Sequence, residues 1–554
     1  MKKNKHLLLW SSLGVLALLV VAAVQENFFK EWRRHQLRAA SQAEGGVDIK
    51  LRQVVVPSLN VMDRCVSCHV GMAPGEPAVA GDKVLAAHKP VVHDPAEFGC
   101  TVCHGGQGRA TDREDAHGEE GHYWPEPMIP AKYAEAGCGT CHTHIEVPNY
   151  ELVRRGEKLV ERYDCLACHA LDGRGGTLRP LGAAAVTSPD LTYVGVRGYD
   201  AQWYEKHIAR RAAAADGPWH ASFGEIAESD LAALKVLLDS RVGTPRLVEA
   251  KALFHTLGCR GCHKIGGVGG EDGPDLTREG EKDPGLADFT HVPGPRSLEG
   301  WFKEHFRAPA TVVPGSKMPE FSLTAEQIDL LTLYMFSLRR SDLPEAYWPK
   351  DRIKVVRFGA SEFSRDGETL YGTFCASCHG TAGQGMRFAG MTAFPAVASE
   401  GFLSLASDRF IAETIRKGRP GRRMAGWGHA NGMTDEEIGR VVAHIRALGG
   451  GVAPVEPEDV AQRLGGNKAR GAALYGEHCS VCHGKAGEGG EGTALNNRVL
   501  LATATDKYMA ETIRLGRPGT SMPTFGMAST VRPALAPDEI ASIVAHIRSW
   551  EVAR

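Results

Sequence analysis

The stretch Cys65-Val66-Ser67-Cys68-His69 contains two cysteines separated by two residues and followed directly by a histidine. This Cys-x-x-Cys-His pattern occurs seven times, and its copies together use all 14 cysteines. Because no cysteine is left over, these motifs and not a set of disulfides should organise the fold. The other six copies are Cys100, Cys103 and His104; Cys138, Cys141 and His142; Cys165, Cys168 and His169; Cys259, Cys262 and His263; Cys375, Cys378 and His379; and Cys479, Cys482 and His483.

A Cys-x-x-Cys-His stretch is typical of covalent haem attachment. Two cysteines at this spacing can react with both vinyl groups of one haem, and the adjacent histidine is then placed to ligate the iron. A disulfide, a redox dithiol or half of a zinc site would also use paired cysteines. None of these alternatives requires a histidine at the same place in seven copies. The sequence therefore predicts seven covalently attached haem c groups, each with its motif histidine as a metal ligand.

Length and charge limit the possible classes of protein. A chain of 554 residues is too long for one hydrophobic core, so we expect several domains. The formal net charge is −2 and the isoelectric point is near 6.9, which gives no support for a nucleic-acid partner. The expected fold class is mostly α, with an N-terminal transmembrane helix, a compact tri-haem segment and four tandem single-haem domains.

The N-terminal region contains an apolar stretch, residues 7–24, that carries no charge over 18 positions. This length is just enough to cross a bilayer as a helix. The alternative is a cleaved secretory signal, with three nearby lysines as its positive region. We expect a retained single-pass anchor in residues 1–24 of the cytoplasmic membrane and a stalk in residues 25–55. Covalent haem attachment takes place outside the cytoplasmic membrane, so the bulk of the chain should be periplasmic.

Residues 56–150 hold three motifs within 78 positions, too close together for three separate single-haem domains. Haems packed against one another must therefore replace most of a protein core in this tri-haem segment. Each iron also needs a sixth ligand, and the segment contains five spare histidines, of which three should ligate. The expected ligands are His88, His93 and His117, and the other candidates are His122 and His144, with Met72 and Met128 as weaker alternatives.

Residues 151–551 repeat with a period near 100 residues. Each unit should begin with a short helix before its motif and end with an amphipathic helix. The last two units are the most alike, since IAETIRKGRPG at 411–421 corresponds to MAETIRLGRPG at 509–519. We place the single-haem units at residues 151–242, 243–342, 361–450 and 451–554, and a linker that could act as a docking strap at residues 343–360.

These units resemble the small all-α class I cytochrome c fold, in which a methionine ahead of the last helix ligates the iron. The resemblance implies Met318 and Met522, which both precede a Pro-x-Phe sequence. It also implies Met424, which lacks the proline, so that three further methionines compete with it. The competitors are Met386, Met391 and Met433.

The first unit departs from this pattern, because alignment places His220 where the others have methionine, with His207 as its rival. Four bis-histidine haems would then be followed by three histidine–methionine haems. A thioether ligand favours reduced iron relative to imidazole, so the potentials should rise along the chain. The remaining histidines should be structural or exposed: His255, His291, His305, His429, His444, His478 and His546.

The run Gly105-Gly106-Gln107-Gly108, followed by Ala116-His117-Gly118 and Trp124, resembles multihaem cytochrome subunits of bacterial bc-type (mena)quinol-oxidising complexes. The resemblance implies cytochrome b-type membrane subunits as partners, and another cytochrome or a terminal oxidase or reductase as acceptor. The expected function is electron transfer by a membrane-anchored heptahaem cytochrome c without catalytic residues of its own. The alternatives are a free-standing electron conduit, or a haem reductase or peroxidase with one open iron position.

Overall fold

The computed structural model describes residues 2–43, 45–89, 91–118, 127–176, 188–200, 202–207, 226–339, 342–429, 432–453 and 459–551. Within these ranges the chain is mostly helical, and its named strands form three two-stranded antiparallel hairpins. The mostly α fold predicted from the sequence is therefore confirmed.

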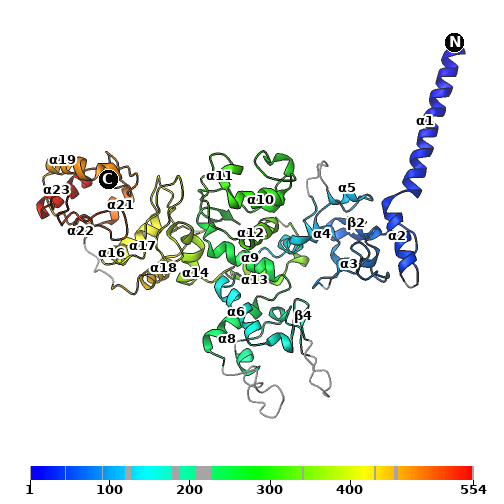
Figure 1. Ribbon diagram of the computed structural model, residues 1–554, viewed down its shortest axis with the longest axis horizontal. Coiled ribbons are helices and arrows are strands. Elements are labelled where there is room, and N and C mark those ends of the chain that lie inside the picture. The colour runs from blue at the N-terminus through cyan, green and yellow to red at the C-terminus, as the bar shows by residue number, and fades with distance from the viewer. Residues whose placement is uncertain are drawn as a thin grey trace.

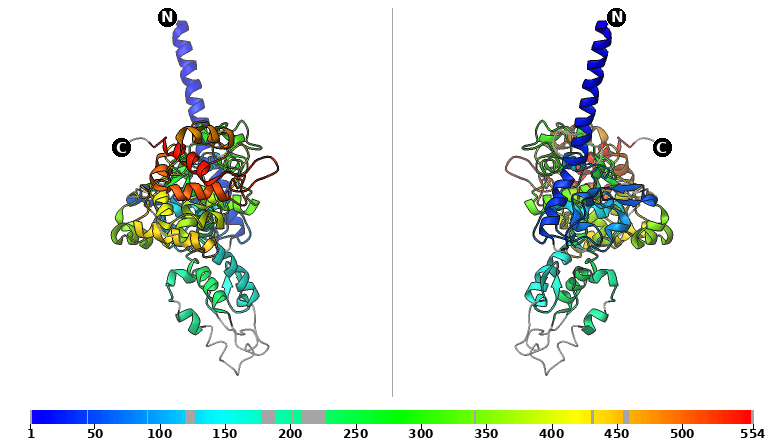
Figure 2. Two further views of the ribbon diagram at one scale, coloured as in Figure 1. Left: turned by 90° about the vertical axis from the view of Figure 1, so that its left-hand side faces the viewer. Right: turned by 90° about the vertical axis from the view of Figure 1, so that its right-hand side faces the viewer.

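Four parts of the chain lie in a row, and a fifth lies beside the row (Figure 1). The head (residues 56–150) is followed along the row by the central segment (243–342), the distal segment (361–450) and the terminal segment (451–554). The side segment (151–242) hangs below the row, as both views of Figure 2 also show. Order in space therefore differs from order in sequence, because the head is next to the central segment.

The N-terminal helix α1 (Lys2–Phe28) is 27 residues long and projects away from the rest of the chain. At 1.5 Å per residue its length is about 40 Å, which exceeds the roughly 30 Å thickness of a bilayer's hydrocarbon core. Its apolar side chains are exposed, as for Leu8 at 69% and Leu18 at 70%. By length and composition, α1 is a candidate membrane span.

The residues expected to form a stalk include a second helix, α2 (Glu31–Gln42), which packs against the head. Trp32, Gln36 and Ala39 are its buried residues. Gln36 donates hydrogen bonds from Nε2 to the carbonyl oxygens of Ser67 (2.9 Å) and Lys50 (2.8 Å). Because Ser67 lies within the first Cys-x-x-Cys-His motif, α2 is attached directly to a motif-bearing element of the head.

The head consists of short elements held together by polar contacts. Asp63 is buried and accepts hydrogen bonds from the amides of Cys100 (2.5 Å) and Thr101 (2.8 Å). This carboxylate therefore joins the hairpin of the head to its second motif. The elements are β1 (Val54–Val56), η1 (Pro57–Leu59), β2 (Val61–Asp63), η2 (Cys65–Ser67), η3 (Val70–Met72), α3 (Pro95–Phe98), α4 (Thr101–His104), α5 (Arg113–His117) and η4 (Ala131–Thr140).

Each of the other four segments is built on two packed helices, one before its motif and one near its end. A Cβ at Gly156, Gly367 or Gly471 in the first helix would overlap the backbone of the second, so these crossings require glycine. The central segment has the buried Ala250 in its first helix. The pairs are α6 (Tyr150–Arg162) with α8 (Glu228–Asp239), α9 (Pro245–Thr256) with α12 (Ala325–Ser337), α14 (Gly367–Phe374) with α18 (Asp435–Leu448), and α19 (Lys468–His478) with α23 (Pro537–Arg548).

Shorter elements complete these four segments and the strap (residues 343–360). The side segment adds η5 (Cys165–Ala167), β3 (Ala170–Leu171), β4 (Arg174–Gly175) and η6 (Val194–Arg197). The central segment adds η7 (Cys259–Gly261), β5 (Lys264–Ile265), β6 (Val268–Gly269), η8 (Glu279–Glu281), η9 (Pro284–Leu286), α10 (Leu298–Arg307) and α11 (Pro309–Val312). The strap contains η10 (Glu345–Tyr347) and α13 (Lys350–Phe358). The distal segment adds α15 (Ala376–His379), α16 (Glu400–Leu403) and α17 (Asp408–Lys417). The terminal segment adds α20 (Ser480–His483), α21 (Arg498–Thr503) and α22 (Asp506–Leu515).

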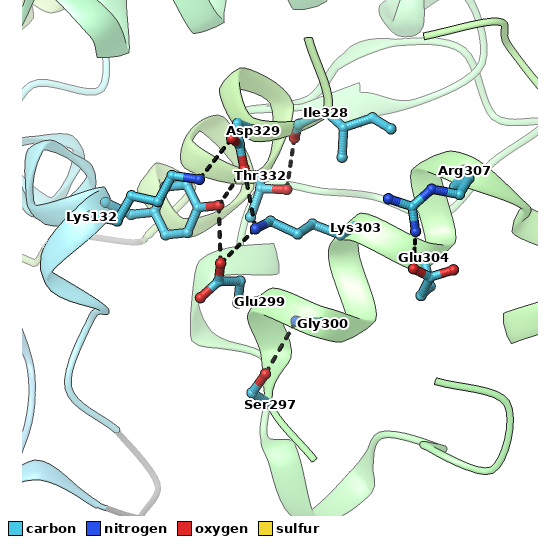
Figure 3. A network of polar contacts seen from close by, with 11 residues as sticks. Lys132, Ser297, Glu299, Gly300, Lys303, Glu304, Arg307, Ile328, Asp329 and Thr332 are labelled. Carbon is cyan, nitrogen blue, oxygen red and sulfur yellow. Dashed lines mark hydrogen bonds and ion pairs between the residues drawn. The ribbon is translucent and has the colours of Figure 1, made fainter. Parts of the chain in front are cut away.

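A polar network joins the head directly to the central segment (Figure 3). Asp329 on α12 accepts hydrogen bonds from Lys132 Nζ (2.6 Å) and from the Tyr133 hydroxyl (2.9 Å) on η4. Lys303 on α10 pairs with both Glu299 (2.6 Å) and Asp329 (3.2 Å). Since η4 carries the third motif, this network holds that motif against the central segment.

A buried cluster of charges joins the central and distal segments. Lys251 and Arg260, which are 5% and 2% exposed, both pair with Glu362. Burial alone would raise the pKa of Glu362, but these two cations lower it to about 2. Lys251 also donates a hydrogen bond to the carbonyl oxygen of Ile145 (2.7 Å), so the head, central and distal segments meet at this cluster.

We predict that Asp329 stabilises the junction between head and central segment in a pH-dependent way. Burial alone would raise its pKa, but hydrogen bonds from Lys132, Tyr133 and Lys303 lower it to about 2. The unfolded value is about 4, so the stabilisation is complete above pH 4 and is lost as the pH falls through 2. Asp329→Asn should lower the free energy of unfolding at pH 7 by about 2 kcal/mol. It should also flatten the pH dependence of unfolding below pH 4, measured by amide hydrogen exchange in η4 and α12.

Asp435→Asn is the matched control for this prediction. The Asp435 side chain is 80% exposed and pairs with Arg416 at the surface. Exposed ion pairs contribute about 0–1 kcal/mol, so this variant should exchange nearly as the parent does. Equal exchange in the two variants would contradict the role of Asp329.

Candidate functional site

Each of the first four motif histidines faces a second histidine from another part of the chain. The interplanar angles of these pairs vary from 23° to 66°, yet the distance between ring centroids is nearly constant. A metal ion shared by the two rings of each pair would produce such a constant distance at variable angles. The pairs are His69 with His117 (6.3 Å), His104 with His88 (6.0 Å), His142 with His93 (6.1 Å) and His169 with His207 (6.2 Å).

This distance fits one iron with two axial imidazoles. A metal–imidazole bond is about 2 Å long, and the ring centre lies about 1 Å behind the bonded nitrogen, so the two ring centres should be about 6 Å apart. Parallel rings in direct contact are closer, as for Tyr199 and Trp203 at 3.8 Å with an interplanar angle of 8°. The two nearly parallel pairs, His69 with His117 and His142 with His93, therefore leave room for a metal between the rings.

The three pairs of the head line one continuous cavity of about 2840 Å³. All six histidines of these pairs and all six cysteines of the three motifs line it. Protein interiors are normally filled by side chains to high density, so a cavity of this size is unusual for a core. It fits the expectation that haems fill the centre of the head. Residues of the side segment, including Tyr193 and Val242, line the same cavity.

Most motif histidines are oriented by a backbone carbonyl oxygen that accepts from Nδ1. A hydrogen bond at Nδ1 fixes the tautomer in which Nε2 is free to bind a metal. The acceptors lie 10 to 20 residues after the histidine, in the loop that follows each motif. They are Val84 for His69 (3.1 Å), Pro189 for His169 (2.8 Å), Pro274 for His263 (2.9 Å), Pro395 for His379 (2.8 Å) and Thr493 for His483 (2.8 Å).

Two motif histidines of the head differ from the other five. His142 Nδ1 lies 3.0 Å from Oδ1 of Asp351, so its acceptor is a carboxylate on α13 of the strap. His104 Nδ1 is buried and has no hydrogen-bond partner among the described residues. In the head, the Nδ1 of the first motif histidine therefore contacts a backbone carbonyl oxygen and that of the third contacts a carboxylate, whereas that of the second has no acceptor among the described residues.

Burial keeps several of these imidazoles neutral. It lowers the pKa of His69, His104 and His379 below the ordinary histidine value. Burial also lowers the pKa of His93, one of the facing histidines. Because only a neutral imidazole can bind a metal through Nε2, these environments suit ligation near neutral pH.

The methionines implied by the class I resemblance lie in loops ahead of the last helices. Met318 and Met522 are partly buried and pack against the hydrophobic core. Met424 and Met522 occupy equivalent turns, because the Arg419 amide donates to the Met424 carbonyl (2.8 Å) and the Arg517 amide donates to the Met522 carbonyl (3.0 Å). The structure therefore supports Met424 by analogy with Met522.

The three competitors of Met424 have other contacts. Met433 is 3% exposed and forms part of the hydrophobic core. Met391 Sδ lies 3.4 Å from Nη1 of Arg423, and Met386 forms an isolated bridge with Phe394. None of these three positions repeats the turn that Met424 shares with Met522.

Several sequence candidates lie away from the facing pairs. His122, Trp124 and His220 fall outside the described residues. His144 Nδ1 lies 2.8 Å from the Thr143 hydroxyl. Met72 and Met128 line the head cavity. A histidine already lies opposite each motif histidine of the head, so neither methionine is needed as a sixth ligand.

Neighbouring motifs touch one another at their cysteines. The Cys65 and Cys100 side chains are neighbours. Cys262 of the central segment lies in the same way beside Cys378 of the distal segment. In the head, a Cβ on Gly137 would overlap the Cys103 carbonyl oxygen, so the second and third motifs are also in direct contact. The attachment points of these haems therefore lie side by side.

Two functional residues received little or no weight from sequence alone. His207 was only the rival of His220, although Trp203 four residues earlier stacks on it at 5.1 Å. Trp301 stacks on His305 at the same spacing, so this arrangement alone did not single out His207. Asp351 gave no signal, because its contact with His142 spans 209 residues.

Two families match the C-terminal part of the chain. The family described as "Cytochrome C oxidase, cbb3-type, subunit III" matches residues 363–445 and 466–547. The family described as "Cytochrome c" matches residues 247–339. Each matched range contains one motif and lies within the central, distal or terminal segment.

Relatives match only part of the chain. The cbb3-type cytochrome c oxidase subunit FixP of Bradyrhizobium sp. (strain ORS 278) is 30% identical over 169 residues, which are 29% of this chain and 53% of that protein. The cytochrome bc1 complex cytochrome c subunit of Mycobacterium tuberculosis is 26% identical over 182 residues, which are 32% of this chain and 61% of that protein. The chain thus spans about half the length of the first of these relatives and somewhat more of the second.

Among solved structures, a chain of the reducing HAO-like protein complex of Kuenenia stuttgartiensis is 22% identical, with 34% of this chain and 96% of that chain covered and a TM-score of 0.25. The family matches already account for three motifs, and four more of the same pattern precede them. Since cytochrome c domains bind haem c covalently through such motifs, the chain is a multihaem c-type cytochrome that resembles the cytochrome c subunits of oxidase and bc1 complexes.

Proposed function

We propose that this chain is a membrane-anchored heptahaem cytochrome c that carries electrons from a quinol-oxidising membrane complex to a periplasmic or terminal acceptor. The four facing histidine pairs carry this proposal, because two axial imidazoles leave no open iron position for a substrate. Relatives named as subunits of oxidase and bc1 complexes support a redox complex as partner.

In this proposal every haem is held by its motif histidine on one side and by a distal residue on the other. The sequence favoured His220 for the side segment, but the 6.2 Å distance between His169 and His207 supports His207. Bound haem supplies an iron that accepts and donates one electron. The distal ligands, named by the first cysteine of each motif, are His117 for Cys65, His88 for Cys100, His93 for Cys138, His207 for Cys165, Met318 for Cys259, Met424 for Cys375 and Met522 for Cys479.

The ligand types give the row a direction. Methionine sulfur favours reduced iron more than imidazole does, so the three methionine sites should have the higher potentials. These sites belong to the central, distal and terminal segments, which follow the head along the row. Electrons that enter at the head would therefore move to higher potential towards the terminal segment.

Contacts between motifs and segments support this route. The adjacent cysteines link the first and second motifs of the head and link the central motif to the distal one. The network around Asp329 holds the third motif against the central segment. Phe410 of the distal segment lies 4.6 Å from Tyr508 of the terminal segment, between ring centroids. The side segment lies off this route, so its haem would be a branch.

The helix α1 is the proposed single-pass anchor in the cytoplasmic membrane, with the haem-bearing bulk of the chain in the periplasm. Its exposed apolar side chains support insertion into lipid. Covalent haem attachment outside the cytoplasm supports this orientation. The head, which is packed on α2 next to the anchor, would then be the part nearest the membrane partner.

We predict seven haems per chain, one for each motif. Replacing Cys375 and Cys378 together by alanine should reduce the count to six, measured by pyridine haemochrome absorbance against protein concentration and by intact mass. Ser377→Ala, a change between these two cysteines, should retain all seven. A count of five or fewer in the parent protein would contradict the heptahaem assignment.

We predict that His207→Met moves one haem from the low-potential group of four towards the high-potential group of three. The reduced-to-oxidised ratio of that haem at a fixed potential should rise by about tenfold or more, which corresponds to 59 mV for a one-electron couple. Spectroelectrochemical titration of the solubilised protein measures this ratio. His220→Met is the matched control and should titrate like the parent; the reverse result would identify His220 as the ligand.

We predict that residues 2–28 remain in the mature protein and hold it in the membrane. A variant in which a cleavable export signal replaces them should keep its haems and appear in the soluble periplasmic fraction. The parent should resist high-salt washing and require detergent for release, because burial of apolar side chains does not depend on ionic strength. A mature N-terminus near Gln25, found by sequencing, would overturn this prediction.

A further inference from the structure

The third motif histidine stands out among the seven because its Nδ1 partner is a carboxylate. His142 Nδ1 and Asp351 Oδ1 lie 3.0 Å apart, and both side chains are largely buried, at 31% and 21% exposed. Five other motif histidines face neutral carbonyl oxygens, and the Nδ1 of His104 has no acceptor among the described residues. The effect of a charged acceptor at His142 can thus be compared with that of the neutral acceptors at the other motif histidines of the same chain.

Asp351 is held in place by elements on both sides of it. It lies in the first turn of α13, where the positive end of the helix dipole stabilises a carboxylate. The strap is fixed to the head by the hydroxyls of Tyr347 and Ser58, 2.5 Å apart, and by the contact of Tyr347 with Phe98. The carboxylate is therefore presented to His142 by a segment that follows the whole central segment in sequence.

The cations nearest to Asp351 have other interactions. Lys251 pairs with Glu362 and donates to the carbonyl oxygen of Ile145. The guanidinium of Arg352 lies over the Trp348 ring, 4.5 Å from its centroid. Oδ2 of Asp351 is buried and accepts no hydrogen bond from a described residue. His142 is therefore the principal partner of this carboxylate.

A carboxylate changes the ligand that it contacts. Hydrogen bonds with one charged partner are roughly twice as strong as neutral ones. A carboxylate that accepts from Nδ1 of a ligating histidine increases the basicity of Nε2, which strengthens its bond to the metal. Stronger donation and a nearby negative charge both favour Fe(III) over Fe(II), so the potential of the iron falls.

We propose, on the basis of the function proposed above, that Asp351 is a positioning residue that lowers the potential of the haem held by Cys138, Cys141 and His142. This haem is at the end of the head next to the central segment, where η4 contacts α12. The strap therefore sets the potential at the point where electrons leave the head. With this lowered reduction potential, the last haem of the head would be mostly oxidised, and an electron that reaches it would pass on to the central segment.

Asp351→Asn tests the charge without removing the hydrogen bond. The asparagine carbonyl can still accept from His142 Nδ1, so the variant converts the carboxylate into the neutral acceptor that five other motifs have. In spectroelectrochemical titration of the full solubilised protein, one low-potential haem should show a reduced-to-oxidised ratio at least about tenfold higher at fixed potential, equivalent to 59 mV. Its low-spin electron paramagnetic resonance signal should shift as well, because imidazole donation changes.

Two further variants separate charge from structure. Asp351→Glu keeps the carboxylate and should stay closer to the parent than Asp351→Asn does. Glu345→Gln removes an exposed carboxylate of the same strap, 59% exposed and paired with Arg357, and should titrate like the parent.

The outcomes also distinguish this inference from the function on which it rests. If the parent shows four bis-histidine haems but Asp351→Asn titrates like the parent, only the role of Asp351 is overturned. An equal rise in Asp351→Asn and Asp351→Glu would assign the effect to displacement of the strap and would also overturn it. If the parent lacks four low-potential bis-histidine components, both the ligand assignment and the inference fail.

Discussion

Two imidazole rings can share one iron only when their centres are held about 6 Å apart, and the histidine pairs proposed as haem ligands in the N-terminal part of the chain meet this requirement. The head meets it with very short elements, such as the five-residue helix α5 that ends at His117. Polar contacts hold these short elements together; for example, buried Asp63 joins the hairpin to the second motif. The polypeptide of the head therefore acts as a scaffold for ring pairs.

The features that could be predicted from sequence are local ones. Each motif is five residues long, and the apolar N-terminal stretch is continuous, so neither depends on how distant segments pack. The three histidines ranked first in the head, His88, His93 and His117, all face motif rings in the structure. Their partners could not be read from sequence, because His117 faces an earlier motif whereas His88 and His93 face later ones.

The features that sequence reasoning missed depend on contacts between distant residues. Tyr133 and Asp329, which bring the head against the central segment, are 196 residues apart. A repeat with a regular period suggests units stacked in chain order, yet the second part of the chain in sequence lies beside the row (Figure 1). The strap looked like a linker because its contacts with the head leave no periodic pattern. In each case tertiary packing, which has no local signature, decided the arrangement.

In the proposed function, the position of the side segment decides what its haem can do. In electrical terms the proposed row of haems is a series circuit, in which loss of any element stops the current. The side segment is a branch with one connection, which can store charge but carries no current through it. It adds a place for charge without lengthening the path, and its residues Tyr193 and Val242 line the cavity of the head. Its haem can therefore fill and empty with the haems of the head while conduction along the row continues.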